Sequence, residues 1–197
     1  MKAGASIGSR ESARMSKTGT SLLVTRRSFI AMGAAFIVMP HVARASTIAS
    51  GQRKLSFDNP HTGERLTTVY WEKGDYIGEA LTDVNHIMRD YRTGEAHNID
   101  PRLLDLLHTL HDKLGSKRPF EIISGYRSPQ TNADLAEHSS GVAKHSLHMK
   151  GMAIDINLTD VKLKSLKKAA IGLKKGGVGY YPKSNFVHVD VGRVRTW

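Results

Sequence analysis

The chain has 197 residues, a formal net charge of +11 and no cysteine. This length fits one domain of ordinary size with a short appendage, and a hydrophobic content of 40% is enough for a packed core. The lack of cysteine excludes a disulfide scaffold, a Cys-ligated zinc finger, an iron–sulfur site and a cysteine nucleophile. Because no run of 18 apolar residues is present, we expect no permanent membrane span.

The first 45 residues are predicted to be a signal peptide (1–45). The pair Arg26-Arg27 precedes an apolar stretch at residues 30–39, and a small-x-small cleavage site follows at residues 43–45. This order of parts is typical of export signals, and the twin arginine is typical of the Tat route. The alternative is an N-terminal helix that packs on the domain. We expect a periplasmic protein that begins near Ser46 and has no stable membrane insertion after signal removal.

The high net charge comes largely from this N-terminal segment. Removing residues 1–45 takes away seven Lys or Arg residues and one acidic residue, which leaves a net charge of +5. A domain of this charge does not require a nucleic-acid partner, but it suits a protein that works near an anionic polymer such as the cell wall. The densest basic stretch, residues 162–175, is interpreted as the solvated face of a helix.

Residues 46–197 are predicted to form one α+β domain, in which helices pack on a small antiparallel sheet. Alternating and β-branched residues predict a hairpin over residues 55–71. Apolar spacing predicts a helix over roughly 76–92, and Asp100-Pro101 begins a second helix that ends at Gly115. The later elements are a strand at 120–124, a weaker helix at 129–138, a strand at 152–157, a helix from Thr159 or Asp160 to Lys175, and strands at 178–181 and 186–191.

Candidate chemistry concentrates in two stretches of the chain. His148 stands seven residues before Asp155, with small residues between them. Neutral imidazole nitrogen and carboxylate oxygen are ligands that zinc accepts, so this pair is predicted to form half of a zinc site. Further along, His188 and Asp190 lie two residues apart on a predicted strand and therefore share a face. A His–Asp pair alone is ordinary, but the later His-x-Asp strand favours a metal site.

The pattern Ser-x-His-x-x-Gly-x-Ala-x-Asp at residues 146–155, followed by a strand histidine, resembles the signature of the LAS zinc peptidases. That group includes D-Ala-D-Ala carboxypeptidases and murein endopeptidases, and its fold is a LAS/hedgehog-type zinc peptidase fold. The resemblance is strongest to the YcbK-type branch and covers nearly the whole chain. It rests on NPHTGE at 59–64, RDYR at 89–92, ISGYRS at 123–128, GVAK at 141–144 and GGVGYYP at 176–182.

The resemblance implies three zinc ligands, His148, Asp155 and His188, with an open fourth position for the water that zinc activates. It also implies that Arg127, in the loop after a predicted strand, stabilises the oxyanion of the reaction. The alternative for Arg127 is a surface arginine that ties its loop to a carboxylate. Zn²⁺ is therefore the expected cofactor, although these ligand types only bias the choice among divalent metals.

The sequence leaves the identity of the general base open. Many relatives carry Glu or Asp three residues before the last histidine ligand, where this sequence has Asn185, which cannot accept a proton from water. Asp190 is the nearest carboxylate and is assigned either as the base or, slightly favoured, as a group that orients a ligand histidine. His145 is interpreted as a solvated loop residue. Ser146 and Tyr180 are assigned to substrate binding.

The sequence and its resemblance thus predict a zinc-dependent peptidoglycan endopeptidase that Tat exports to the periplasm. Its partners would be the stem peptides of the wall, with diaminopimelate–diaminopimelate bonds as the first expected target and D-Ala-linked bonds as the second. The alternative is a non-catalytic, zinc-containing module that binds peptidoglycan, because Asn185 replaces the expected base. The preferred cross-link, the oligomeric state and the need for a partner protein are left open by the sequence.

Overall fold

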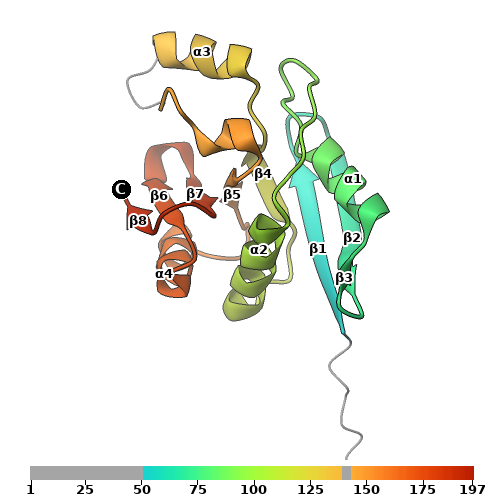
Figure 1. Ribbon diagram of the computed structural model, residues 1–197. Helices are drawn as coiled ribbons and strands as arrows, with labels where there is room; N and C mark the ends of the chain where they lie inside the picture. The colour runs from blue at the N-terminus through green and yellow to red at the C-terminus, as the bar shows by residue number, and fades with distance from the viewer. Residues whose placement is uncertain (1–50, 139–142) are drawn as a thin grey trace, which may run out of the picture. The chain divides into compact units, whose positions relative to one another are not determined.

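The computed structural model describes residues 51–138 and 143–197 (Figure 1). The predicted signal peptide, residues 1–45, lies outside the described residues. The elements in chain order are β1 Gln52–Asn59, β2 Glu64–Glu72, β3 Asp75–Tyr76, α1 Gly78–Ile87, α2 Pro101–Leu114, β4 Phe120–Ser124, α3 Pro129–His138, the 3-10 helix η1 Leu147–Lys150, β5 Ala153–Asn157, α4 Leu163–Leu173, β6 Gly177–Tyr181, the 3-10 helix η2 Pro182–Ser184, β7 Phe186–Asp190 and β8 Arg195–Thr196.

One sheet runs through the domain and confirms the predicted α+β class. The described residues form an eight-stranded sheet in the order β3-β2-β1-β4-β5-β7-β6-β8. Most neighbouring strands are antiparallel, whereas β1 pairs with β4 and β6 pairs with β8 in parallel. The two parallel pairs join segments that are far apart in sequence, because parallel neighbours need a long crossover connection.

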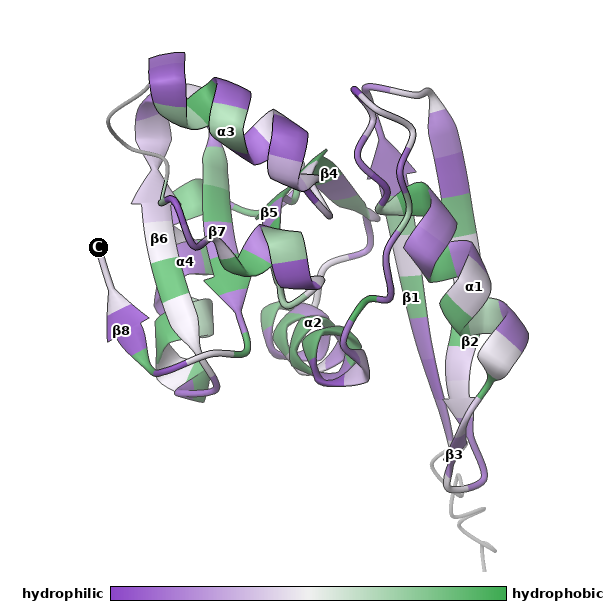
Figure 2. Ribbon diagram, turned by 45° about the horizontal axis from the view of Figure 1, so that its top comes forward, coloured by the Kyte–Doolittle hydropathy of each residue, from purple (hydrophilic) through white to green (hydrophobic). Residues whose placement is uncertain are grey.

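One face of strand β7 lies in the hydrophobic core, and the other face lies outside it. Val187 and Val189 are fully buried in the core, together with Leu166 of helix α4. Because side chains alternate along a strand, His188 lies on the face opposite to this core. Figure 2 shows hydrophobic residues along the neighbouring strands β5 and β7. Helix α4 therefore supports one face of these strands and leaves the other face for polar chemistry.

Two helices differ in length from the sequence prediction. Helix α1 ends at Ile87 rather than near residue 92, because the carbonyl of Met88 accepts from the backbone N–H of Tyr126 at 2.7 Å. Helix α4 begins at Leu163 rather than at residue 159 or 160. The predicted cap Asp160 instead accepts hydrogen bonds from the Ser116 hydroxyl, at 2.7 Å, and from the Lys117 N–H, at 2.9 Å.

In the two described stretches of the chain, we find no helix with the length and apolarity needed to cross a membrane.

Candidate metal centre

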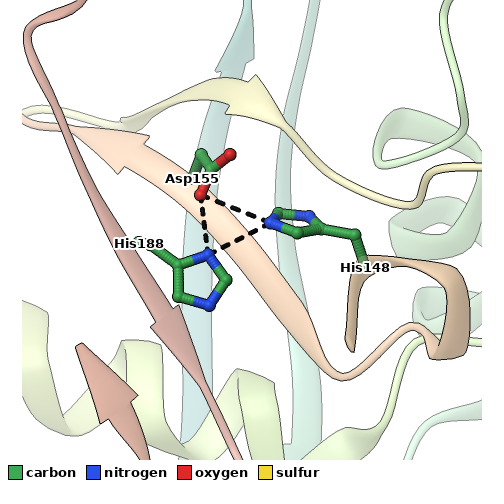
Figure 3. A group of neighbouring side chains, drawn as sticks. All are labelled: His148, Asp155 and His188. Carbon is green, nitrogen blue, oxygen red and sulfur yellow. Dashed lines mark hydrogen bonds and ion pairs between the residues drawn. The ribbon is translucent and has the colours of Figure 1, made fainter. Parts of the chain in front are cut away.

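Two strands and one 3-10 helix bring His148, Asp155 and His188 together (Figure 3). Asp155 of β5 and His188 of β7 are directly opposite each other in the antiparallel register. His148 lies on η1, where the hydroxyl of Ser146 accepts from the His148 N–H at 3.3 Å and caps the helix. The three side chains are buried, and the structure therefore places all three predicted ligands in one cluster.

A glycine fixes the approach of η1 to this cluster. Gly151 ends η1 with a φ of 63°, in the left-handed region that glycine adopts without strain. A Cβ at this position would collide with the backbone carbonyl of Asn98. The small residue between the two predicted ligands is therefore required both by its backbone angle and by the neighbouring chain.

The candidate ligand atoms of the three side chains lie within 4.8 Å of one another. Oδ1 of Asp155 is 2.9 Å from Nδ1 of His188 and 3.3 Å from Nε2 of His148. The two facing imidazole nitrogens are 3.1 Å apart. This separation is within hydrogen-bond distance, so the location of the ring protons decides whether the contact attracts or repels.

In each ring, the nitrogen that points away from the cluster has a hydrogen-bond acceptor as its partner. Nδ1 of His148 is 2.7 Å from the carbonyl oxygen of Gly125, which can only accept, so this nitrogen carries the proton. Nε2 of His188 donates in the same way to Oδ2 of Asp190 at 3.0 Å. In neutral rings, the inner nitrogens therefore present lone pairs to each other and to Asp155. A cation resolves this repulsion, and two imidazoles with one carboxylate form a donor set that suits zinc.

The electrostatics of the cluster also favour a positive charge between the rings. Burial alone would raise the pKa of Asp155, but His148 and His188 hold that pKa well below its usual range. Burial alone would lower the pKa of His188, but hydrogen bonds to Asp155 and Asp190 more than offset it and raise that pKa. The pocket therefore keeps its carboxylate ionised and attracts cationic charge, as a divalent metal site must.

Arg127 lies beside the other oxygen of Asp155. Its Nη2 atom is 4.0 Å from Oδ2 of Asp155, and its side chain is only 12% exposed. Nη1 donates to Oδ1 of Asn132 at 3.3 Å, while Nε is buried without a partner in the described part of the chain. Burial lowers the pKa of Arg127, although a guanidinium remains charged at neutral pH. The guanidinium thus lies close to the cluster of candidate ligands, and its Nε–H is available to donate a further hydrogen bond.

Asp190 lies behind His188 and is fully buried. Besides His188, its carboxylate accepts from the backbone N–H of Gly177 and Gly192 and from both Nη atoms of Arg195, at 3.1 and 2.7 Å. Burial alone would raise the pKa of Asp190, but these hydrogen bonds hold it well below its usual range. Its lone pairs are occupied and it does not line the cleft, so this geometry favours orientation of His188 over general-base catalysis.

A cleft of ≈ 410 Å³ opens over the cluster. Asp155 is the one carboxylate among the described residues that line it, and Asn185 is exposed outside it, with a φ of 56°. The lining residues are Arg127, Ala143, His145, Ser146, Leu147, His148, Asp155, Tyr181, Phe186, His188, Arg195 and Trp197.

The cleft does not include every predicted substrate residue. Ser146 lines it, although its hydroxyl also caps η1. Tyr180 is placed elsewhere, because adjacent residues of β6 point to opposite faces and Nζ of Lys167 lies 4.6 Å from the centre of its ring. Its neighbour Tyr181 lines the cleft in its place, together with Arg195 and Trp197, which the sequence analysis did not assign.

A cluster of two imidazoles and one carboxylate, open to a cleft and flanked by an arginine, fits a metallopeptidase on this α+β fold. Residues 47–197 match the Peptidase_M15_2 family, described as peptidoglycan L,D-endopeptidase MepK. The chain belongs to this family.

Individual relatives agree with the family assignment. The peptidoglycan L,D-endopeptidase MepK of Escherichia coli (strain K12) is 45% identical over 168 residues, which covers 85% of this chain and 91% of the relative. The probable peptidoglycan L,D-endopeptidase MepK of Haemophilus influenzae is 39% identical over 176 residues, covering 87% of this chain and 95% of the relative. The similarity therefore extends over nearly the whole length of both relatives.

Proposed function

We propose that this protein is a zinc-dependent endopeptidase that cleaves peptide cross-links of peptidoglycan. Membership of the MepK family supports the peptidase activity and the peptidoglycan substrate. The observation that carries the proposal is the meeting of two imidazole lone pairs and one carboxylate oxygen beside an open cleft. Diaminopimelate–diaminopimelate bonds are the first proposed target, and D-Ala-linked bonds are the second.

His148, Asp155 and His188 would hold the zinc ion. Bound zinc supplies a water of lowered pKa and polarises the scissile carbonyl. In the neutral rings, the Gly125 carbonyl and the Asp190 carboxylate accept from the outer nitrogens, which leaves the lone pairs of the inner nitrogens for this role. Ser146 and Gly151 fix the helix that carries His148.

Arg127 would stabilise the negative charge that develops on the carbonyl oxygen during attack. Its guanidinium is 4.0 Å from Asp155, has a buried Nε without a partner in the described residues, and lines the cleft. A fixed cation in a partly dehydrated site lowers the free energy of the transition state more than that of the neutral substrate.

Proton transfer would fall to side chains that line the cleft, since Asp190 is buried behind His188. His145 and Tyr181 carry exchangeable protons there. The hydroxyl of Tyr181 accepts from Nε1 of Trp197 at 2.7 Å and can donate its own hydrogen to a substrate. We assign these two residues to proton exchange within the proposal, with Asp190 as a positioning residue.

A non-catalytic module that binds peptidoglycan is the second candidate. It is favoured by Asn185, which stands where a base is expected, and by the absence of a second carboxylate among the described residues of the cleft. Digestion of purified sacculi, followed by chromatography of the soluble fragments, separates the two candidates. We expect cross-linked dimers to disappear, chelator to stop the reaction, and added zinc to restore it.

Two results of this digestion would contradict the proposal. A fully metal-loaded protein that binds sacculi without releasing fragments would favour the binding module. Digestion that continues in excess chelator, or in the His148→Ala variant, would exclude the metal site as the catalytic centre. Loss of bound zinc from His148→Ala, Asp155→Ala and His188→Ala, measured by elemental analysis, tests each ligand separately.

The proposed site of action is the periplasm, reached through the Tat route. The twin arginine at positions 26 and 27 and the wall substrate of the family support this location. Replacing Arg26 and Arg27 with lysine should hold the protein in the cytoplasm, as cell fractionation would show. Periplasmic delivery of that double variant would contradict Tat export.

A further inference from the structure

Trp197 leaves about half of its large apolar side chain exposed to solvent. The described residues include four exposed large hydrophobic side chains, Tyr76, Ile171, Val194 and Trp197. Trp197 is the one of these that lines the metal cleft, and it is 49% exposed. Exposed aromatic groups that border a cleft mark surfaces for ligand contact, because the ring buries large apolar area when a partner covers it.

The indole of Trp197 is held firmly although it is exposed. Its backbone N–H donates to the Val178 carbonyl at 3.2 Å, and its carbonyl accepts from the Tyr180 N–H at 3.1 Å. Its Nε1 donates to the hydroxyl of Tyr181 at 2.7 Å, and the guanidinium carbon of Arg195 lies 4.8 Å from the ring centre. A ring fixed in this way loses little conformational entropy when a ligand binds.

A glycine keeps the space for this ring. A Cβ at Gly179 of β6 would lie 2.7 Å from Cε2 of the Trp197 indole, which is closer than real Cβ contacts. Gly179 is also directly opposite His188 in the β6–β7 register. The strand next to the candidate ligand therefore lacks a side chain where the indole lies.

The ring centres of Trp197 and His188 are 5.2 Å apart. The indole is therefore within reach of a peptide whose scissile carbonyl lies at the candidate metal site. Tyr181 and Phe186, which stack on each other with ring centres 4.5 Å apart, extend the aromatic surface along the same cleft. The polar side of the cleft, with Arg127 and the cluster, borders this apolar surface.

We propose that Trp197 is a substrate-binding residue whose indole packs against the aliphatic chain of the diamino acid in the cross-link. The inference rests on the proposed function and names a specificity contact of the same site. A diamino acid in a peptide cross-link carries methylene groups between its polar ends, and such a chain fits a flat apolar ring beside polar groups. Each methylene removed from water strengthens binding by about fourfold, so this contact discriminates long from short diamino acids.

The chain offers a direct optical test, because it contains two tryptophans, Trp71 and Trp197. Trp71 lies on β2 and is absent from the cleft lining. In the Trp71→Phe variant, fluorescence reports Trp197 alone. We expect a soluble cross-linked dimer to change this emission within the binding phase of a stopped-flow trace, before products form, in the zinc-loaded protein. Unchanged emission at a saturating dimer concentration would overturn the proposal.

Kinetics on the same dimer provide a second readout. Trp197→Ala should raise KM by roughly 10- to 60-fold, as expected for a few lost methylene contacts, with zinc content near that of the parent. Trp197→Leu should raise KM by a smaller factor, and this variant keeps the test valid if the alanine variant does not fold. Val194→Ala is the matched control, because Val194 is 57% exposed in the same segment but lies outside the cleft lining.

The length of the diamino acid supplies the decisive comparison. The parent should prefer the longer side chain in cross-linked dimers that differ by one methylene, and Trp197→Ala should lose most of this preference. An unchanged preference or an unchanged KM in Trp197→Ala would overturn the role of the indole. If the zinc-loaded parent cleaves no dimer at all, the proposed function fails, whereas the emission of Trp197 still shows whether the dimer covers the ring.

Discussion

His188 and Asp190, two residues apart on β7, are joined by a hydrogen bond of 3.0 Å from Nε2 of the imidazole to Oδ2 of the carboxylate. Both Nη atoms of Arg195 donate hydrogen bonds to the same carboxylate. These hydrogen bonds, from Arg195 to Asp190 and from His188 to Asp190, favour one tautomer and one orientation of the His188 ring. We therefore propose that Asp190 would act on a bound metal only through His188.

Asp190→Asn should therefore weaken metal binding without removing it. The amide cannot provide the same charge behind His188, and we expect the affinity for zinc to fall by roughly 10- to 100-fold. Some turnover should remain at saturating zinc. Competition with a chromophoric chelator measures the affinity, and Asp75→Asn, an exposed carboxylate of β3, serves as the control. Normal zinc affinity with greatly reduced turnover would instead identify Asp190 as the base.

Arg127→Ala should separate catalysis from metal binding. The guanidinium is 4.0 Å from Asp155 but is not a metal ligand, so zinc content should be unchanged. We expect kcat to fall by about 10²–10³, which is the usual loss for one oxyanion donor. Steady-state kinetics on a soluble cross-linked dimer measure the effect. Unchanged turnover would return Arg127 to the alternative of an arginine that only ties its loop to a carboxylate.

The acidic side of the stability profile should depend on Glu64. Arg89 donates to this carboxylate at 2.7 and 3.2 Å and, as the main cause, lowers the pKa of Glu64 to about 2. Because the folded pKa is depressed, the stabilisation is fully present above the unfolded pKa near 4.5 and is lost as the pH falls towards 2. The carboxylate is 36% exposed, so solvent screening limits the effect to about 1 kcal/mol or less.

Urea unfolding of the metal-free protein between pH 6 and about 2 tests this dependence. Glu64→Gln should lower the free energy of unfolding near neutral pH and flatten the profile across the window from about 4.5 down to 2. Glu79→Gln is the control, since this acidic residue lies in the first turn of α1 and is exposed. A Glu64→Gln profile parallel to that of the parent would contradict the role of the ion pair.

Local sequence patterns predicted most of the elements, and the family resemblance completed the set of three candidate ligands. Asp155 and His188 each lie on a short strand with alternating apolar residues, and their opposite register follows from the pairing of β5 with β7. Asp100 and Gly115 were identified as the ends of α2 because helix caps are local signals, and the structure confirms both. Local patterns of this kind need no knowledge of the distant chain.

The residues that the sequence analysis missed depend on distant pairing. Arg195 and Trp197 reach the cleft because β8 pairs in parallel with β6, and no local signal predicts a pairing between two such short segments. Tyr180 and Tyr181 differ by one position on β6, and a shift of one residue exchanges the two faces of a strand. The composition of the tyrosine pair could not decide which ring faces the cleft, whereas the register with β7 does.

Gly151→Ala should disrupt the metal centre through the backbone alone. Gly151 has a φ of 63°, and an added Cβ would collide with the carbonyl of Asn98, so η1 must shift and carry His148 with it. Gly94→Ala is a close control, because Gly94 has a φ of 75° but open space around an added Cβ. Both variants should lose about 1–2 kcal/mol of stability from the left-handed backbone, but only Gly151→Ala should also weaken zinc binding.

Chelator competition and urea unfolding of the two variants separate strain from displacement. We expect Gly94→Ala to bind zinc as the parent does, since its loop can accept the methyl group without a collision. Gly151→Ala should bind zinc at least tenfold more weakly, because a ligand nitrogen displaced by a few tenths of an ångström no longer matches the metal–nitrogen distances of about 2.0–2.1 Å. Equal zinc affinities for the two variants would show that η1 accommodates the added methyl group without moving His148. Gly151 would then be required only for the backbone angle of the turn.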